Sequence, residues 1–362
     1  MKKHYNILYL SLEFDKWNLA RPWTYQANLG LEDGFLFNKL SFFTVTTPWL
    51  SRLKDLCYNK TFDQVWVEIV HQNIDIETFE WIKNIAPTRV GLVFESLTYN
   101  EFEVNNSLVL KERKESVEGK INYLTHLIAI DEVDVNYFYI KFGIPSFWWI
   151  SCIPKKFVNK KHLNNNKISK AVFSGTVYGK RIKLIENAAT KNLIIHQNSP
   201  DKNDFNHFIF DAIHLITKKI LLFWPWSVKY LYTLYMFLLR NVRNKNFKIY
   251  LKSISKYSVV LNLPSLVKAY PGRVSEAMSV GSVVLSNIIK NRPQNNSVFI
   301  ENKDIIFYDE DNPDEFTTKL KSILDNDNLR NEIAINCYEK VSEYHTIEIR
   351  ILQIQKWISK NQ

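Results

Sequence analysis

The stretch YPGRVSEAMSVGSVVLSN, residues 270–287, has the residue types and spacing most suited to chemistry. Pro271 and Gly272 end a loop and let the backbone approach a ligand closely. Arg273 and Glu276 follow, one turn apart on one face of a predicted helix. The N–H groups at a helix start and an arginine suit phosphate oxygens, and a carboxylate one turn further in suits two vicinal hydroxyls. Together they describe a nucleotide site, although the spacing alone favours an ordinary surface ion pair.

Short apolar strands alternate with helical stretches along most of the chain. The predicted strands are 6–12, 64–70, 89–95, 126–131, 170–176, 192–197, 257–264, 282–287 and 304–309, and the predicted helices include 76–85, 134–143 and 273–280. This alternation implies parallel sheets covered on both faces. A Lys- and Asn-rich segment, 155–167, interrupts it and is typical of a linker. Because 362 residues exceed the size at which single cores usually divide, the sequence predicts two α/β halves.

Polar residues stand at the ends of many predicted strands. In open parallel sheets, ligands bind at the carboxyl ends of the strands. The residues that this rule nominates are Glu13, Asp15, His71, Glu95, Asp131, Gly175, Pro264, Ser265, Ser286 and Asn287. For each residue taken alone, ordinary loop polarity is the simpler interpretation.

Charge and cysteine content narrow the classes of partner and compartment. The net charge of +10 favours an anionic partner, with a solvated lysine-rich surface as an equal alternative, and no nucleic-acid-binding motif is present. Three widely spaced cysteines indicate buried thiols in a reducing compartment. Glu13 and Asp15 interrupt the first apolar run, so the N-terminus is interpreted as a strand and the protein is expected in the cytoplasm.

The sequence contains no recognisable metal-binding or cofactor-binding motif. Two Asp-x-Asp strings, Asp309–Asp311 and Asp325–Asp327, are interpreted as solvated turns, because the first runs into a helix start and the second lies between helices. The eight histidines show no metal-ligand spacing. No GxSxG, P-loop or GxGxxG motif is present. We therefore expect neither a metal nor a cofactor.

The segment 211–248 is unusually apolar and aromatic. Its apolar run, 220–239, is just long enough to span a bilayer, but Pro225 and Lys229 count against spanning. Its composition predicts an amphipathic hairpin at a membrane surface, with burial in the second half as an equal alternative. The residues predicted to meet lipid are Lys218, Lys219, Leu221, Leu222, Phe223, Trp224, Trp226, Lys229, Tyr230, Tyr232, Tyr235, Phe237, Arg240 and Arg243.

Part of the second half resembles a known family. GRVSEAMSVGSVVLSN and the segment from Asp304 onward resemble the C-terminal half of GT-B glycosyltransferases of the glycosyl-transferase group 1 clan, in particular its CgeB-like branch. The positions that match the pattern of this family are Arg273, Glu276, Gly281, the acidic stretch Asp309–Asp314, His345, Thr346 and Arg350. VFSGTVYGKR, residues 172–181, resembles the strand, glycine loop and arginine that open the second domain of the family.

The resemblance implies a GT-B fold, with two Rossmann-like domains whose parallel sheets face a central cleft. It implies an acceptor domain at 1–154, a linker at 155–167, a donor domain at 168–344 with an insertion at 205–246, and a C-terminal helix at 345–362 that packs back on the first domain. The expected nucleotide-sugar-binding residues are Gly175, Lys180, Arg181, Ser265, Tyr270, Pro271, Gly272, Arg273 and Glu276. The expected catalytic base is among Glu13, Asp15, Glu95 and Asp131.

The expected activity is metal-independent transfer of a sugar from a nucleotide-sugar donor to a carbohydrate or lipid-linked acceptor. The resemblance places this activity in bacterial surface-glycan biosynthesis, at the inner face of the cell membrane. One position departs from the family: retaining members carry two glutamates eight residues apart, and Lys268 stands where the first is expected. Two alternatives therefore stay open. One is a catalytically inactive GT-B-like nucleotide-binding or glycan-assembly partner, and the other is a membrane-attached interaction protein built around 211–248.

Overall fold

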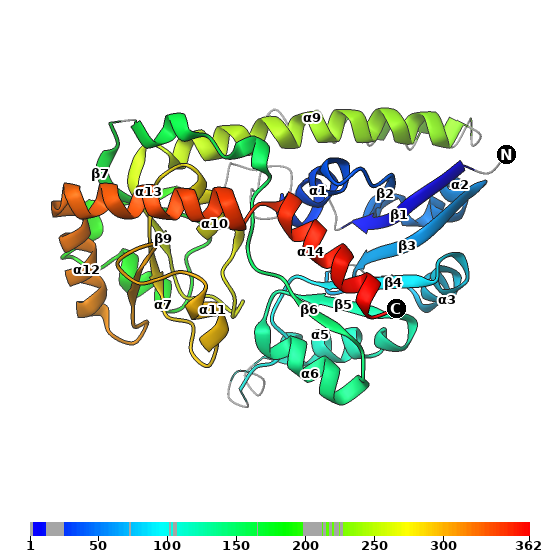
Figure 1. Cartoon of the computed structure of the whole chain (residues 1–362), viewed down its shortest axis with the longest axis horizontal. Helices are drawn as coiled ribbons and strands as arrows, with labels where there is room; N and C mark the ends of the chain where they lie inside the picture. Colours follow the sequence, from blue (N-terminus) through cyan, green and yellow to red (C-terminus); the bar gives the residue numbers. More distant parts are fainter. Residues whose placement is uncertain are drawn as a thin grey trace. The chain divides into compact units, whose positions relative to one another are not determined.

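The structure, a computed structural model, has two compact units, each containing one parallel sheet (Figure 1). It describes residues 3–11, 25–71, 74–100, 103, 107–164, 166–197, 212, 215–216, 219–220, 224 and 227–362. Unit 1 comprises Met1–Trp149, Lys202–Lys245 and Arg350–Gln362, and unit 2 comprises Ile150–Asp201 and Asn246–Ile349.

Unit 1 is built on a six-stranded sheet with the order β2-β1-β3-β4-β5-β6. Its strands are β1 (Lys3–Ser11), β2 (Phe42–Thr46), β3 (Lys60–Glu68), β4 (Thr88–Val93), β5 (His126–Ala129) and β6 (Ser146–Trp148), and its helices include α1 (Leu31–Phe37), α2 (Leu53–Cys57), α3 (Ile76–Ile85), α5 (Leu108–Glu118) and α6 (Glu132–Phe142). Every strand pair in the sheet is parallel. The sequence predicts four of these strands and misses β2 and β6.

Helix boundaries in unit 1 follow from local capping. α3 has the predicted bounds, because the Asp75 side chain accepts a hydrogen bond from the Thr78 N–H at 2.7 Å and so fixes its start. α6 starts two residues before the predicted helix, because Asp131 caps it through the Val133 N–H at 3.0 Å. It stops at Gly143, whose φ of 65° is the left-handed conformation that glycine adopts readily.

Unit 2 is built on a five-stranded sheet with the order β11-β10-β9-β7-β8, again parallel throughout. Its strands are β7 (Ile168–Ser174), β8 (Ile194–Gln197), β9 (Tyr257–Asn262), β10 (Val283–Asn287) and β11 (Ile306–Tyr308), and its helices include α7 (Lys180–Ile185), α10 (Gly272–Ser279), α11 (Pro293–Ser297), α12 (Pro313–Asp325) and α13 (Asp327–Tyr344). All five strands and α10 confirm the sequence-based predictions to within a few residues.

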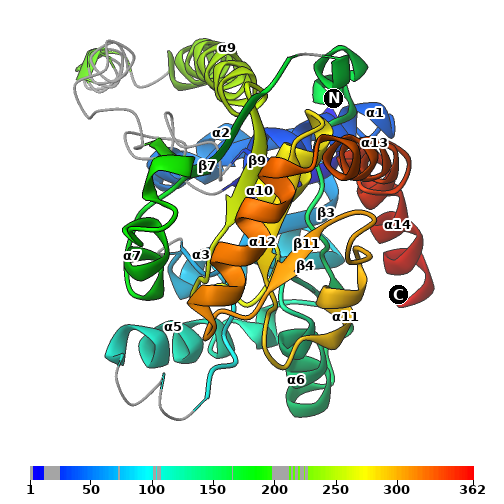
Figure 2. The same ribbon diagram turned by 90° about the vertical axis from the view of Figure 1, so that its left-hand side faces the viewer.

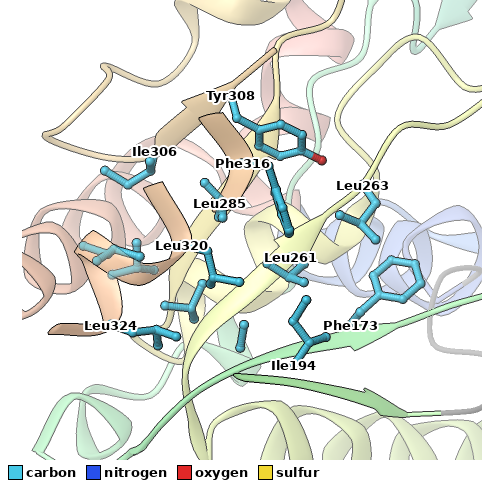
Figure 3. Close-up of a cluster of buried hydrophobic side chains, with 14 of the residues drawn as sticks. Phe173, Ile194, Leu261, Leu263, Leu285, Ile306, Tyr308, Phe316, Leu320 and Leu324 are labelled. Carbon is cyan, nitrogen blue, oxygen red and sulfur yellow. The ribbon is translucent and has the colours of Figure 1, made fainter. Parts of the chain in front are cut away.

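Helix α12 lies over the sheet of unit 2 (Figure 2), and a hydrophobic core holds the strands against it (Figure 3). Phe173 on β7 and Leu261 on β9 contribute fully buried side chains. Tyr308, at the end of β11, packs edge-on against Phe316 of α12 with ring centroids 4.9 Å apart. Because these side chains come from several strands, their packing aligns the carboxyl ends of the strands, where the candidate site lies.

The segment 211–248 differs most from the sequence-based prediction. Residues Val228–Ile254 form one long helix, α9, instead of a hairpin (Figure 1). Within unit 1 the Tyr232 ring is buried and lies 5.0 Å from that of Trp49. Arg240 donates two hydrogen bonds to the Glu32 carboxylate, at 2.7 and 2.9 Å. Part of the surface of α9 that was predicted to face lipid therefore packs within unit 1 instead.

Four residues of that surface are corrected by the structure. Tyr232, Tyr235 and Arg243 are buried, and Arg240 is ion-paired, so none of the four is available to lipid. Trp224, Tyr230 and Phe237 are exposed, at 55%, 78% and 62% of their surface. The predicted contacts at Lys218, Leu221, Leu222, Phe223 and Trp226 lie outside the described residues. In the part of the chain that the structure describes, no helix has the length and apolar content needed to cross a bilayer.

The Glu32–Arg240 pair gives a prediction about stability. Glu32→Gln should lower the free energy of unfolding by about 1–3 kcal/mol, because the buried carboxylate also accepts a 2.5 Å hydrogen bond from Thr44 and both partners lose a charged acceptor. Calorimetry should show a melting temperature lower by about 2–4 °C for each kcal/mol lost. The control is Glu77→Gln on the exposed surface of α3. Equal melting temperatures for the two variants would show that the pair does not anchor α9.

Candidate functional site

The predicted donor-binding residues gather at the carboxyl edge of the sheet of unit 2. Gly175 follows β7, Ser265 follows β9, and Arg273 lies in the first turn of α10. A Cβ atom added to Gly175 would lie 2.7 Å from Nη2 of Arg273, so any larger residue at this position would have to displace the guanidinium. The structure therefore brings together residues almost one hundred positions apart in the sequence.

Arg273 is held in place by an aromatic ring and a hydroxyl group. Its guanidinium carbon lies 4.8 Å from the centroid of the Phe173 ring, a cation–π contact. Its Nη1 atom is buried and has no hydrogen-bond partner among the described residues. Burial lowers the pKa of Arg273, while Tyr250 and Glu276 act in the opposite direction. An arginine with a buried, unsatisfied N–H is suited to an anionic ligand.

Glu276 lies beside Arg273, as the spacing predicts, but is almost fully buried. The Tyr250 hydroxyl, from the unit 2 part of α9, hydrogen-bonds with both Glu276 and Arg273. Burial raises the pKa of Tyr250 well above its ordinary value, and the charge of Glu276 adds to this effect. Tyr250 therefore donates to the carboxylate throughout the physiological pH range. Sequence reasoning missed Tyr250, because no local pattern links α9 to α10.

Arg181 and Lys180 are already engaged by other groups. Arg181 donates hydrogen bonds to the carbonyl oxygens of Pro264 at 2.5 Å and Thr176 at 2.8 Å, so it ties together the loops after β9 and β7. Burial lowers its pKa to about 10. Lys180 is ion-paired with Glu310 at 2.8 Å and Asp311 at 2.5 Å. The structure thus gives both residues partners within the protein, where the sequence predicted donor phosphates.

The loop between β9 and α10 supplies the remaining predicted residues. Ser265 Oγ accepts a hydrogen bond from the Val267 N–H at 3.2 Å, which shapes the loop. The Pro271 carbonyl accepts a hydrogen bond from Ser151 at 3.2 Å, and the Gly272 carbonyl accepts one from Ser275 at 3.0 Å. These bonds fix the start of α10, whose first turn presents N–H groups at the edge of the sheet.

Tyr270 points its side chain into the protein. Its ring lies 5.7 Å from that of Phe299, and its backbone N–H donates to Asn295 at 3.3 Å. The Tyr270 hydroxyl is buried without a hydrogen-bond partner in the described part of the chain. Tyr270 therefore contributes packing next to α10.

Three other positions of the family pattern have structural roles in this chain. His345 caps the C-terminal end of α13, and Thr346 forms a parallel bridge with Ile153. Arg350 donates to Gln353 at 2.8 Å.

In unit 1 a charged cluster lies at the carboxyl ends of β3 and β4. His71 is held between two carboxylates, with Nδ1 2.9 Å from Glu68 and Nε2 3.0 Å from Glu95. Arg113 forms a second ion pair with Glu95. Burial opposes the charge on His71, but the two carboxylates raise its pKa to about 9. His71 follows a predicted strand, and nothing in the sequence showed that it would bind Glu95.

Of the four predicted catalytic bases, the structure describes two, and these lie in different surroundings. Glu95 is partly buried, yet His71 and Arg113 hold its pKa below the ordinary value, which makes it a weak base. Asp131 is fully buried and caps α6, so it has a structural role in this fold, and its catalytic role stays a prediction. Glu13 and Asp15 lie outside the described residues.

The Asp-x-Asp strings are held by basic side chains. Lys290 pairs with Asp311 and lies 3.8 Å from Asp309. Asp327 pairs with Arg330 in the first turn of α13. No group of three or more potential metal ligands occurs among the described residues. Metal independence stays a prediction.

Comparison with known proteins places the site in a recognisable fold. Residues 234–356 match the protein family described as "Glycosyl transferase-like". No curated protein is similar to the chain in sequence. An alpha-glucosyltransferase in complex with UDP and a 13-mer DNA containing a HMU base is 9% identical with a TM-score of 0.63, and the match covers 99% of this chain and 100% of that chain.

Two further structures extend the comparison. Anabaena HepE in complex with UDP and glucose is 11% identical with a TM-score of 0.55, over 99% of this chain and 100% of that chain. S. aureus TarM in complex with Fondaparinux, alpha-GlcNAc-glycerol and UDP is 15% identical with a TM-score of 0.52, over 87% of this chain. The match spans only 58% of the TarM chain. These likenesses show that the chain has the GT-B fold, as predicted, while the CgeB-like branch stays a prediction.

The charged cluster of unit 1 gives a prediction about pH. His71 should titrate near pH 9 in an NMR titration, because both of its carboxylate partners stabilise the imidazolium form. Since its folded pKa lies above the ordinary 6.5, its stabilising effect should be complete below pH 6.5 and lost as the pH rises through 9. In Glu95→Gln the His71 pKa should fall, because one of the two carboxylates that stabilise the imidazolium form is lost. A His71 pKa near 6.5 in the wild type would contradict the observed pairing.

Proposed function

We propose that the chain is a glycosyltransferase that moves a sugar from a nucleotide-sugar donor to a carbohydrate or lipid-linked acceptor. One observation carries the proposal: Arg273 presents a buried, unpartnered Nη1 atom at the first turn of α10, with Glu276 one turn further in. The GT-B fold and the family match over 234–356 support it. The UDP complexes of the alpha-glucosyltransferase and of HepE make a uridine nucleotide the first donor to test.

In this proposal, the diphosphate binds at the start of α10. Arg273 lies in the first turn of α10, so in this proposal both its Nη1 atom and the N–H groups of that turn donate to phosphate oxygens. Glu276 accepts hydrogen bonds from the ribose hydroxyls, and the Tyr250 hydroxyl orients its carboxylate. Lys180 and Arg181, which already have partners in the protein, hold the surrounding loops.

Sugar transfer also requires the protein to stabilise the leaving diphosphate and to accept the proton of the acceptor hydroxyl. The acceptor oxygen bonds to the anomeric carbon, the bond from that carbon to the diphosphate oxygen breaks, and the leaving diphosphate takes the electron pair. Arg273 and the helix N–H groups stabilise the charge that develops on it, without a metal. A base accepts the acceptor proton. Glu13 and Asp15, which follow β1 in the sequence, are the first choices for this base.

A second candidate function rests on Lys268. If the glutamate missing at this position is essential, the chain is a GT-B-like nucleotide-binding or glycan-assembly partner without turnover. Lys268 lies in the loop after β9, where it lines a small hollow with Lys290 and Glu310. Both functions require nucleotide binding, so release of UDP from UDP-sugars in the presence of acceptor glycans distinguishes them.

The proposed acceptor class places the protein at the cytoplasmic face of a membrane, in surface-glycan biosynthesis. The exposed side chains of Trp224, Tyr230 and Phe237 support peripheral contact, because aromatic side chains favour the headgroup region. In S. aureus TarM, a structure with Fondaparinux and alpha-GlcNAc-glycerol shows that a protein of similar fold binds glycan-like molecules. A lipid-linked acceptor is confined to the surface where such contact occurs.

The donor site gives a prediction about affinity. Arg273→Ala should weaken binding of UDP by about 10- to 100-fold, because it removes a charge-assisted hydrogen bond worth about 1.5–3 kcal/mol. Glu276→Gln should weaken binding of UDP more than binding of 2′-deoxy-UDP, because only UDP has both ribose hydroxyls. Isothermal titration calorimetry measures both effects.

The control for this experiment is Arg52→Ala, at an exposed arginine of unit 1 that should leave the affinity unchanged. Arg273→Lys should bind with intermediate affinity, since it keeps the charge and loses the fork of two donors. Wild-type affinity in both Arg273→Ala and Glu276→Gln would exclude this site.

The exposed aromatic surface gives a prediction about membrane binding. The wild-type chain should float with vesicles that contain anionic lipid at low salt. A variant with Trp224, Tyr230 and Phe237 changed to Ser should float less, because apolar burial at the interface is lost. The control changes Leu36, Phe37 and Ile76, which are also exposed in unit 1, to Ser. No flotation of the wild type, or equal loss in both variants, would contradict the membrane proposal.

A further inference from the structure

A cavity of about 820 Å³ opens at the amino end of the sheet of unit 2. Its wall includes Ile168, the first residue of β7, and Lys256, which directly precedes β9. Gly175 and α10 lie at the opposite, carboxyl edge of the same sheet. The cavity is therefore separate from the candidate donor site, and its volume falls within the range of small-molecule sites.

The lining of the cavity is strongly basic. Lys248 and Lys252 come from the last turns of α9, Lys256 lies in the following turn, and Lys156 faces them from the η5 helix (Lys155–Phe157). Among the described residues, no acidic side chain lines the cavity. Across the residues that the structure describes, Lys248, Lys252 and Lys256 form no ion pair. Like charges four residues apart repel each other, and an anion between them would relieve this repulsion.

The end of α9 would normally oppose an anion, because helix C-termini carry partial negative charge. Here Lys167 compensates the partial negative charge at the end of α9. Its ammonium group donates to the carbonyl oxygens of Ser255 and Val280, both at 2.9 Å. Burial lowers the pKa of Lys167 to about 8, so the group is mostly charged at pH 7 and neutralises the helix end from behind the cavity.

The cavity also offers a neutral donor and an apolar wall. His162 lines it, and Nδ1 of this histidine is buried with no hydrogen-bond partner in the described part of the chain. Phe157 and Leu251 form the apolar wall, and the Phe157 ring is supported by Phe247 at 4.9 Å. Ammonium groups beside an apolar wall suit an anionic group attached to an organic body.

We propose that this cavity binds a phosphate monoester or diester, independently of the donor nucleotide. The lysines contact the phosphate oxygens as point charges, and Phe157 and Leu251 contact the ester group. Two kinds of molecule carry such a phosphate ester group: an anionic phospholipid, in its headgroup, and a water-soluble phosphate ester. The proposal does not depend on the proposed transferase activity, because no residue of the cavity belongs to the donor site.

Calorimetry with the full chain, saturated with UDP to occupy any donor site, tests the proposal. The two probes are glycerol 3-phosphate and dihexanoyl phosphatidylglycerol below its micellar concentration. The wild type should bind at least one probe. The variant K252E/K256E should bind at least tenfold more weakly, and K252Q/K256Q should also be weakened. Binding of the lipid alone identifies the headgroup as the ligand, and binding of both identifies the phosphate ester itself.

The matched control is K303E/K321E, which changes two exposed lysines of unit 2 and alters the net charge equally. This control should keep wild-type affinity, and circular dichroism should show that all variants are folded. Binding of neither probe by the wild type would overturn the proposal. Equal weakening in the control and in K252E/K256E would also overturn it, since the effect would then be one of net charge.

Discussion

The buried contact among Arg273, Glu276 and Tyr250 is the constraint on which the carboxyl edge of the sheet in unit 2 depends. Removing a guanidinium from water is costly unless charge and hydrogen bonds compensate, and here a carboxylate, a hydroxyl and an aromatic face do so. Because Nη1 stays unsatisfied, the arrangement is incomplete without a further acceptor. Gly175 leaves room for the Arg273 guanidinium because it has no side chain. Arg181 stabilises the neighbouring loops through its hydrogen bonds to their carbonyl groups.

The two ends of the sheet in unit 2 differ in how their charges are balanced. At the carboxyl edge, Lys180 and Lys290 are paired with acidic side chains, whereas Arg273 Nη1 has no hydrogen-bond partner among the described residues. At the amino edge, Lys248 and Lys252 line the cavity, and none of the other described residues in its wall is acidic. In the two proposals, the first arrangement selects an anion by a few directed hydrogen bonds, and the second attracts anions more generally. This difference fits one specific nucleotide site and one less selective phosphate site in the same unit.

Local patterns predicted most of the fold, and long-range packing explains the rest. α3 was predicted with its observed bounds because Asp75 caps it within the same segment. The sequence alone led to a lipid-facing interpretation of the apolar run in α9, because its contacts with Trp49 and Glu32 join residues about two hundred positions apart. The same limit applies to the site. The pairing of Arg273 with Glu276 follows from helical spacing, whereas Tyr250 and the capture of Glu95 by His71 depend on the folded chain.

A crystal structure of the chain with UDP tests the central claim most directly, because it locates the nucleotide atom by atom. The account predicts a phosphate oxygen at about 2.7–3.2 Å from Nη1 of Arg273, and a ribose hydroxyl at a similar distance from the Glu276 carboxylate. UDP bound elsewhere, with Nη1 of Arg273 still lacking an acceptor and Glu276 still bonded only within the protein, would contradict it.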